Sequence, residues 1–596
     1  MRYFQNFIVL SYKAVLRAVL RFPLTVLALL AEAGLTCYVI SLDKDPNLNL
    51  QKWIFILLFS AFVGLATTFI LERFKWKSSI QIIVYGGASL VLLAYALIIW
   101  PSPEINYLVG ARTSVAIFSL ICLTLWIPSY KDGYGFHRVS LVHFKSFFTS
   151  VLYAAVLDGG LSAILAAINI LLFRINGHWY GYIAAIVWIL FATLYDLSLL
   201  PKFNATDEPS INFAMDRSEY PKLLKILISY IAIPLITTYT LVLLAYFVKI
   251  VFTQVWPIGQ LGPMILAYSA LGFILFILAS SLENKFSKTY QVLFPKVLIL
   301  IVLVQISSIV IRIQAYGFTE SRYYLGLFAL YTLVMAILLS FKWVKKLQWI
   351  AIIAMCFALV SVIPPLDAFS VSRASQKDRL ETLLTKAGVL SNQVIVPQSD
   401  VDLNVRLETT SILDYMNQRH YLVDLSWLPQ DFNLNQDFKS TFGFESAYGS
   451  YMDENDYFYA SLNRQEPIDI VGYDVYIQHS LYRQDYEVID PRVTFTVKNQ
   501  LYTLEFNRSS EFDVVVKIVD SSRNTLVETP IYGFVESLQG ITDQPKEELS
   551  LETMSFNIEN TSARMRIIFQ FINVNLSGPD DPGADYEIAI LIDILN

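Results

Sequence analysis

The stretch KVLILIVLVQISSIVIRIQAYGFTESRYYLGLFALYTLVMAILLSFK, Lys296 to Lys342, decides the fold. It covers most of two apolar runs, near 292–313 and 323–341, which are separated by one short turn that carries charged residues. A helix needs about 20 apolar residues to cross the hydrocarbon core of a bilayer, and each run has about this length. The stretch therefore predicts two transmembrane helices joined by a charged turn.

The same length test finds eleven apolar segments along the chain. Their approximate bounds are 23–42, 53–71, 80–100, 111–130, 147–173, 179–200, 225–251, 264–282, 292–313, 323–341 and 349–364. The last segment is the shortest. We therefore predict an α-helical polytopic membrane domain of about eleven transmembrane helices over residues 23–364.

The composition also indicates an integral membrane protein. The chain has 596 residues, of which 55% are hydrophobic and 16% charged, and its mean hydropathy is +0.50. Residues 1–364 hold 27 Lys and Arg against 14 Asp and Glu, whereas residues 365–596 hold 17 against 36. This asymmetry predicts two regions in different surroundings, with the lipid bilayer as the partner of the first. We expect no nucleic-acid partner.

Positive charge predicts the orientation, because Lys and Arg in short loops are retained on the cytoplasmic side. With the N-terminus placed in the cytoplasm, 20 basic residues fall on the cytoplasmic side and 7 on the other. The seven are Lys44, Lys52, Arg112, Arg174, Lys249, Arg312 and Arg322. An odd number of crossings then places residues 365–596 outside, so we predict a plasma-membrane protein with an extracytoplasmic C-terminus.

Residues 1–22 are predicted to form a cytoplasmic amphipathic segment. Lys13, Arg17 and Arg21 recur every four residues, which places them on one face of a helix. Such a stripe can lie on the inner leaflet, where anionic lipid attracts it. Ordinary basic flanking of the first crossing explains the same residues.

The acidic C-terminal region is predicted to be an α+β domain outside the membrane. Within a mixed helical region, 365–445, Ser375 can cap a short helix that stops at Gly388, and a second helix is expected near 411–418. Residues 446–596 are expected to be mainly β. Six segments alternate with period two, which predicts an antiparallel β-sandwich of about 120 residues: YDVYIQHSLY, RVTFTVKN, YTLEF, DVVVKIVD, RMRIIFQFINVNL and YEIAILIDIL.

Three motifs carry a family resemblance. They are WPIG at Trp256–Gly259, the pattern R-I-x-x-Y-G-x-T-x-x-R-Y that starts at Arg312, and SRASQKDRLETLL beyond the last crossing. Together they resemble the bacterial domain-of-unknown-function 4153 family of multi-pass membrane proteins. The resemblance implies a bacterial plasma-membrane protein and assigns no catalytic or binding residue.

Ionisable groups at membrane depth are costly and point to function by default. Glu32 lies in the middle of the first crossing, and Asp158 lies among small residues in the fifth. Asn169 is three helical turns beyond Asp158, on the same face. This polar stripe predicts either a proton or solute path or hydrogen bonds that hold helices together, and we favour the second.

The region 312–322, at the turn between the ninth and tenth apolar segments, holds Arg312, Glu320 and Arg322. Gly317 is expected to end the ninth helix with a positive φ, and Thr319 or Ser321 to cap the tenth. Glu320 suits the N-terminus of a helix and can neutralise one arginine. The remaining positive charge predicts either docking of the acidic outer domain, which we favour, or capture of a lipid or polyprenyl phosphate.

No catalytic residue, cofactor site or metal site is predicted, because the sequence holds no G-x-S-x-G, H-E-x-x-H, P-loop or Cys/His metal spacing. We expect a non-catalytic envelope sensor, binding or scaffold protein, whose partners include an anionic lipid, an envelope component or a protein held by the outer domain. One alternative is a lipid-linked transferase that uses Asp43 and Asp45. The other is a secondary transporter that uses a membrane-embedded acidic site such as Asp158.

Overall fold

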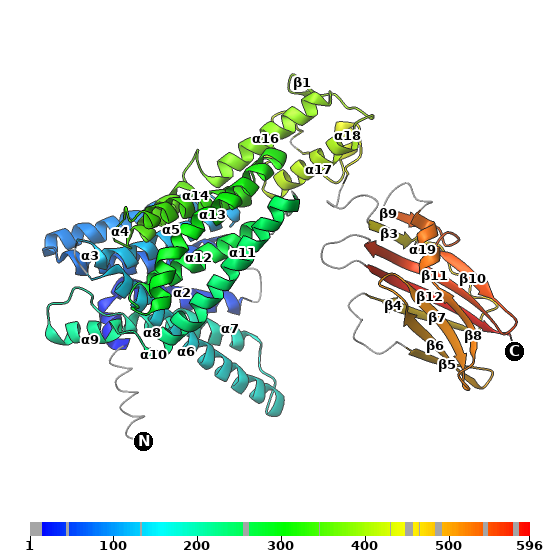
Figure 1. Ribbon diagram of the computed structural model, residues 1–596, viewed down its shortest axis with the longest axis horizontal. Coiled ribbons are helices and arrows are strands. Elements are labelled where there is room, and N and C mark those ends of the chain that lie inside the picture. The colour runs from blue at the N-terminus through cyan, green and yellow to red at the C-terminus, as the bar shows by residue number, and fades with distance from the viewer. Residues whose placement is uncertain are drawn as a thin grey trace. The chain divides into compact units, whose positions relative to one another are not determined.

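The structure is a computed structural model of the chain (Figure 1). It describes residues 15–595, except 43–46, 132–133, 254–260, 345, 430, 448–456, 464, 483–491, 540–545 and 576–582. The chain divides into two compact units. The first, which we call the membrane unit, comprises Met1–Gln398 and Ile412–Asp437; the second, the strand-rich unit, comprises Ser399–Ser411 and Phe438–Asn596.

Ten helical segments among the described residues are long and apolar enough to cross a membrane. The helices of the membrane unit before α16 are α2 (Pro23–Ser41), α3 (Leu48–Phe74), α4 (Ser78–Ile99), α5 (Tyr107–Trp126), α6 (Phe136–Leu171), α7 (His178–Ala185), α8 (Thr193–Leu199), α9 (Glu208–Ser218), α10 (Lys222–Ile226), α11 (Ile233–Thr253), α12 (Leu261–Ala279), α13 (Lys285–Tyr316), α14 (Glu320–Ser340) and α15 (Trp349–Val360). They confirm a multi-pass membrane protein. The segment predicted at 349–364 is α15, a shorter apolar helix of 12 residues.

Two of the long segments contain a π-helical turn. Residues Ile186–Ala192 join α7 to α8, and Leu227–Ala232 join α10 to α11. The second turn ends just before Pro234, which has no N–H to donate and disrupts the regular helix ladder. The Thr237 hydroxyl donates to the carbonyl of Ile233 at 2.7 Å, the kind of side-chain bond that satisfies polar backbone next to a proline.

The loops predicted to share a side of the membrane do lie together. One end of the helices lies near helix α16 (Ala368–Lys386), and we call this end the α16 face. Here Arg419 lies over the ring of Tyr107 at 4.1 Å, and the Tyr323 hydroxyl donates to the carbonyl of Leu366. At the opposite end, Arg21 forms a two-pronged ion pair with Glu72, at 2.7 and 2.8 Å. Arg21, predicted to lie on a lipid-facing stripe, therefore joins two helices.

Two helices follow the last apolar segment, α16 (Ala368–Lys386) and α17 (Leu403–Gln418). Helix α16 continues from the bundle beside α14 (Figure 1). It begins earlier than the sequence suggested, because the carboxylate of Asp367, not the hydroxyl of Ser375, accepts from the first backbone N–H groups at 3.0 Å. Gly388, with φ +73°, follows its last turn as predicted.

All six predicted strands are present in the strand-rich unit. A four-stranded antiparallel sheet has the order β5 (Arg492–Val497), β6 (Gln500–Arg508), β7 (Val514–Asp520) and β8 (Thr525–Pro530). A six-stranded sheet has the order β4 (Val475–Leu481), β12 (Gly583–Ile594), β11 (Ala563–Asn575), β3 (Tyr457–Leu462) and β9 (Lys546–Leu549), with β10 (Ser555–Glu559) also paired to β11. Only β3 and β9 pair in parallel among these described strands. The C-terminal part is therefore rich in antiparallel strands.

The two sheets contribute to one cluster of buried apolar side chains. Leu504 and Val516 from the four-stranded sheet belong to it, together with Ile567 and Ile590 from the six-stranded sheet. Val535 of the short helix α19 (Tyr532–Gln539) is fully buried in the same cluster. This core follows from the alternating apolar pattern, which turns every second side chain of a strand to the same face.

Close packing of α2 on α3 depends on Gly64, and this contact can be tested. A Cβ atom at position 64 would lie 2.8 Å from the backbone nitrogen and the hydroxyl oxygen of Thr25. Because a backbone atom cannot rotate away, we expect Gly64→Ala to destabilise the helix pair by about 2 kcal/mol. A lowered thermal unfolding midpoint of the purified full-length protein would show this.

Gly159→Ala is the matched control, because a Cβ at that position would have no described atom within 4 Å apart from its chain neighbours and the backbone of its own helix. Alanine favours a helix over glycine by about 1 kcal/mol, so this variant should unfold at the same temperature or higher. Equal midpoints for Gly64→Ala and the wild type would contradict the packing argument.

Candidate functional site

The turn between α13 and α14 is held by its own backbone and by Arg322. Gly317 ends α13 with φ +69°, as predicted, and Thr319 stands at the N-cap of α14 without a side-chain bond to the backbone. The guanidinium of Arg322 donates to the carbonyls of Tyr316 and Gly317, at 3.1 and 3.0 Å. Arg322 of α14 therefore closes the end of the preceding helix, α13.

Glu320, the first residue of α14, is the centre of the site. Its side chain is buried, with the residue only 6% exposed. The hydroxyl of Tyr415 donates to one carboxylate oxygen, and that of Tyr421 donates to the other at 2.7 Å. The Nε atom of Arg419 lies 3.6 Å from the same carboxylate. We call these four residues the Glu320 cluster.

Burial and charge in the Glu320 cluster favour neutral tyrosines. Burial raises the pKa of both Tyr415 and Tyr421, and the hydrogen bond and negative charge of Glu320 raise them further. Both hydroxyls therefore stay protonated at physiological pH and remain donors. A carboxylate with two hydroxyl donors and a nearby guanidinium joins segments that are far apart in the sequence.

Helix α16 covers the same turn from another side. The backbone N–H of Phe318 donates to the Ser375 hydroxyl at 3.0 Å, and the amide of Gln376 donates to the carbonyls of Tyr316 and Phe318 at 3.0 and 2.7 Å. Arg379 donates to the Tyr316 carbonyl at 3.0 Å. The free carbonyls at the end of α13 are thus satisfied by α16 side chains.

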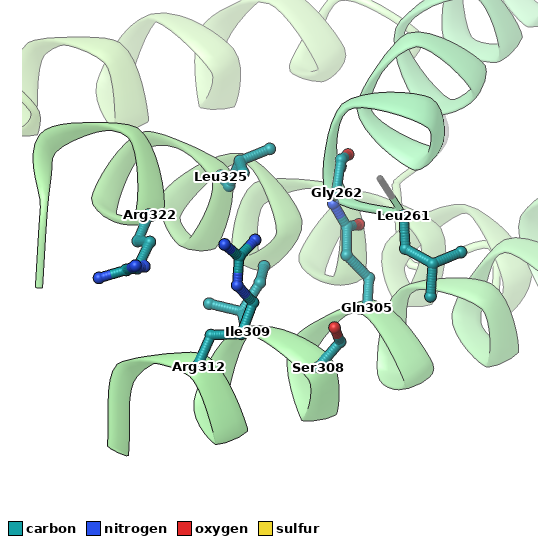
Figure 2. A pocket seen from close by; sticks show the side chains of 8 residues that line it. All are labelled: Leu261, Gly262, Gln305, Ser308, Ile309, Arg312, Arg322 and Leu325. Atoms are coloured by element: carbon teal, nitrogen blue, oxygen red, sulfur yellow. Dashed lines mark hydrogen bonds between the residues drawn. The ribbon is translucent and has the colours of Figure 1, made fainter. Parts of the chain in front are cut away.

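Arg312 lines a small cavity in the same region (Figure 2). Figure 2 shows Arg312 and Gln305 extending from α13 toward the neighbouring helices, while the guanidinium of Arg322 turns away from them. The Gln305 amide donates to the Gly262 carbonyl at 3.4 Å. The cavity has room for about 20 Å³, enough for a water molecule but not for a lipid headgroup.

The three predicted polar residues of the membrane are not brought together. Asp158 accepts a 3.4 Å hydrogen bond from the indole of Trp188, whereas Asn169 accepts one from the backbone of Ile175 at the end of α6. Glu32 is buried in α2, and one of its oxygens has no hydrogen-bond partner among the described residues. The bond from Trp188 is consistent with a packing role for Asp158, and the use of these residues as a transport path stays a prediction.

Several predicted features lie outside the residues that the structure describes. They are Lys13 of the basic stripe, the WPIG motif at Trp256–Gly259, and the acidic pair Asp43 and Asp45. Within the described ranges, no group of three or more His, Cys, Asp or Glu side chains is placed to hold a metal ion.

The sequence did not point to the partners of Glu320. Tyr415 and Tyr421 are common residues in a polar region, and the spacing between them fits no motif. The one usable signal was Arg419, a basic residue next to the end of the predicted helix 411–418. A single sequence does not reveal that this arginine reaches a glutamate about one hundred residues earlier.

The Glu320 cluster can be tested with Glu320→Gln. The amide cannot balance the Arg419 charge or accept at both positions, so we expect the docked segment to lose about 2 kcal/mol. Because 1.4 kcal/mol corresponds to a tenfold change in an equilibrium, local opening should increase roughly 30-fold. The rate of tryptic cleavage after Arg419, measured on the full-length protein, reports this opening.

Glu104→Gln is the control for that experiment. Glu104 pairs with His420 at 3.4 Å on the same face, but both side chains are at least half exposed. An exposed pair contributes little, so cleavage after Arg419 should be nearly unchanged. Equal cleavage rates in both variants would show that the buried carboxylate does not hold the segment.

Comparisons with known proteins agree with the membrane fold and leave the activity open. Part of the chain is 27% identical, over 185 residues, to the uncharacterized protein PM1469 of Pasteurella multocida; the match covers 30% of this chain and 31% of that protein. No solved structure matches the chain. Residues 30–392 match the family described as domain of unknown function DUF4153. That match spans more than half of the chain and includes α3 to α16 with the turn that bears Glu320, so this protein belongs to the DUF4153 family.

Proposed function

We propose that this protein is a non-catalytic envelope protein that binds or scaffolds a partner through its strand-rich unit outside the plasma membrane. The Glu320 cluster carries the proposal, because it fastens residues beyond the last apolar helix onto the membrane helices. Helix α17 contains Tyr415, so its C-terminal part is fastened to the start of α14. A fastened segment beyond the last apolar helix suits a protein that carries a binding domain.

We infer that the α16 face is extracytoplasmic. The support is the distribution of Lys and Arg along the sequence, of which 20 fall on the predicted cytoplasmic side and 7 on the predicted outer side. The contacts of Arg419 with Tyr107 and of Tyr323 with Leu366 bring loops of the basic-poor set together, as this orientation requires.

We infer eleven crossings, with α15 as the last. Gln348, just before α15, lies 3.4 Å from Ser129 in a loop of the cytoplasmic set, whereas Leu366 follows α15 at the α16 face. A helix of 12 residues is only about 18 Å long. The turns that follow Val360, together with local thinning of the bilayer, account for the rest of the membrane thickness.

We also infer that the two sheets of the strand-rich unit form a sandwich, which their shared buried cluster supports. Strand β4 stands at one end of the described strand order. Tyr476 within β4 and Tyr482 directly after it are 45% and 44% exposed, whereas Ile477 and Leu481 of the strand are buried. An edge strand with exposed tyrosines suits a protein partner that adds a strand or packs on the rings.

Cysteine labelling in intact cells tests the orientation. In a variant without the three native cysteines, Val423→Cys should react with a membrane-impermeant maleimide, because Val423 is 87% exposed at the α16 face. Lys202→Cys, in a loop of the opposite set, should react only after the membrane is permeabilised. The reverse pattern would contradict the proposed orientation.

Site-specific photo-crosslinking in cells tests the binding role. A photoreactive amino acid at Tyr476 of the full-length protein should give a discrete crosslinked product with an envelope protein. Leu501, 52% exposed in the other sheet, is the matched control and should give none. Failure to crosslink at Tyr476, or equal products at both positions, would argue against β4 as the binding edge.

A further inference from the structure

Two cavities are lined by successive parts of helix α5, one of them at the α16 face. The polar cavity, of about 1000 Å³, is lined by the start of α5, by the residues from Pro364 to Arg373, and by Gln418 to Tyr421. The apolar cavity, of about 390 Å³, is lined mainly by apolar side chains of α5, α12, α14 and α15. All of these residues belong to the membrane unit.

The linings of the two cavities follow one another along the chain, and we call the two cavities together the crevice. On α5, Ala111 and Arg112 line the polar part, and Val115, Phe118 and Cys122 line the apolar part. Residues spaced by three or four lie on one face of a helix, so a single face of α5 runs through both. The chain after α15 also passes from the apolar part to the polar part, since Ser361 lines the first and Pro364 lines the second.

The polar part presents arginine side chains that the protein does not fully use. Arg112 forms no hydrogen bond or ion pair with any of the residues that the structure describes. The Nε atom of Arg419 is buried without a hydrogen-bond partner and lies 3.6 Å from Glu320. The side chain of Arg373 is 46% exposed, donates one hydrogen bond of 3.4 Å to Asp424 and lies over the Tyr421 ring.

The acidic groups that line the polar part are already engaged. The carboxylate of Asp367 accepts three hydrogen bonds from Phe369 and Ser370 at the start of α16. Glu104 pairs with His420 at 3.4 Å. Neither is paired with Arg112, so the charge of this arginine is left for an anion from outside the protein.

We propose that this crevice binds one anionic glycerophospholipid. Its phosphate pairs with Arg112 and Arg419, since a guanidinium binds phosphate oxygens through two parallel hydrogen bonds. An acyl chain occupies the apolar part, where Phe118, Phe328 and Phe357 contribute to the wall. A lipid with a net negative charge is preferred over a zwitterionic one, because the positive amine of a zwitterionic headgroup is repelled by the same arginines.

The length of the apolar part suits a phospholipid better than a polyprenyl phosphate. Its wall runs from Ile350 at the start of α15 to Ser361 just after the end of that helix, a helical rise of about 16 Å. An acyl chain has about this length, because two opposed acyl chains fill the hydrocarbon core of about 30 Å. The proposal concerns the membrane unit alone and does not depend on what the strand-rich unit binds.

Native mass spectrometry of the full-length protein in detergent tests this proposal. Phosphatidylglycerol should bind at least tenfold more tightly than phosphatidylcholine with the same acyl chains. Arg112→Gln should remove that preference, and Arg112→Lys, which keeps the charge, should retain most of it. Ala354→Trp should weaken binding of both lipids, because Ala354 lines the apolar part.

Arg174→Gln is the matched control, because Arg174 is an exposed arginine outside the crevice. It should bind phosphatidylglycerol as the wild type does. An unchanged preference in Arg112→Gln, equal binding of the two lipids by the wild type, or stronger binding of a polyprenyl phosphate than of phosphatidylglycerol would overturn the proposal. The unfolding midpoints of all variants identify any variant that has lost its fold. If Arg112→Gln has lost its fold, the lipid preference of Arg112→Lys still tests the proposal.

Discussion

A carboxylate buried at the end of a transmembrane helix must find partners, and Glu320 finds them 95 and 101 residues further along the chain. Burial of an ionised carboxylate costs several kcal/mol unless hydrogen bonds and opposite charge offset it. Tyr415, Tyr421 and Arg419 supply both, and the N-terminus of α14 adds a favourable dipole. The path of residues 412–437 over the helices follows from this requirement, as does the position of Arg419 at the crevice.

Features with a local physical cause could be predicted from the sequence. Long apolar runs predict membrane helices, and alternation predicts the strands of the second unit, because each pattern reflects one burial surface repeated along one element. The predicted start of α16 was wrong, and the reason is local as well. Ser375 and Asp367 are both acceptable caps, and Asp367 prevails because its carboxylate reaches two backbone N–H groups. Ser375 is used instead by the neighbouring turn, at Phe318.

One sequence could not predict which side of the contact at the α16 face carries the acid and which side carries the base. From the composition we predicted that basic residues of the membrane turn would contact an acidic outer region. This prediction used net charge, which is a sum over many solvated groups. The buried contact has the opposite sense, with the acid Glu320 on the membrane helix and the base Arg419 on the segment that docks. Arg21 and Glu72 show the same limit, because a pair separated by 51 residues leaves no periodic signal.

Arg419 belongs both to the Glu320 cluster and to the wall of the polar cavity. Its Nε atom stands 3.6 Å from the Glu320 carboxylate, beyond hydrogen-bond distance, so an anion in the crevice can attract this guanidinium without breaking a hydrogen bond to Glu320. Coupling between two equilibria is reciprocal. A lipid phosphate that draws Arg419 toward the crevice therefore changes the docking of residues 412–437, and the docked state in turn sets the affinity for the lipid. Membrane composition and the position of α17 are linked through one side chain.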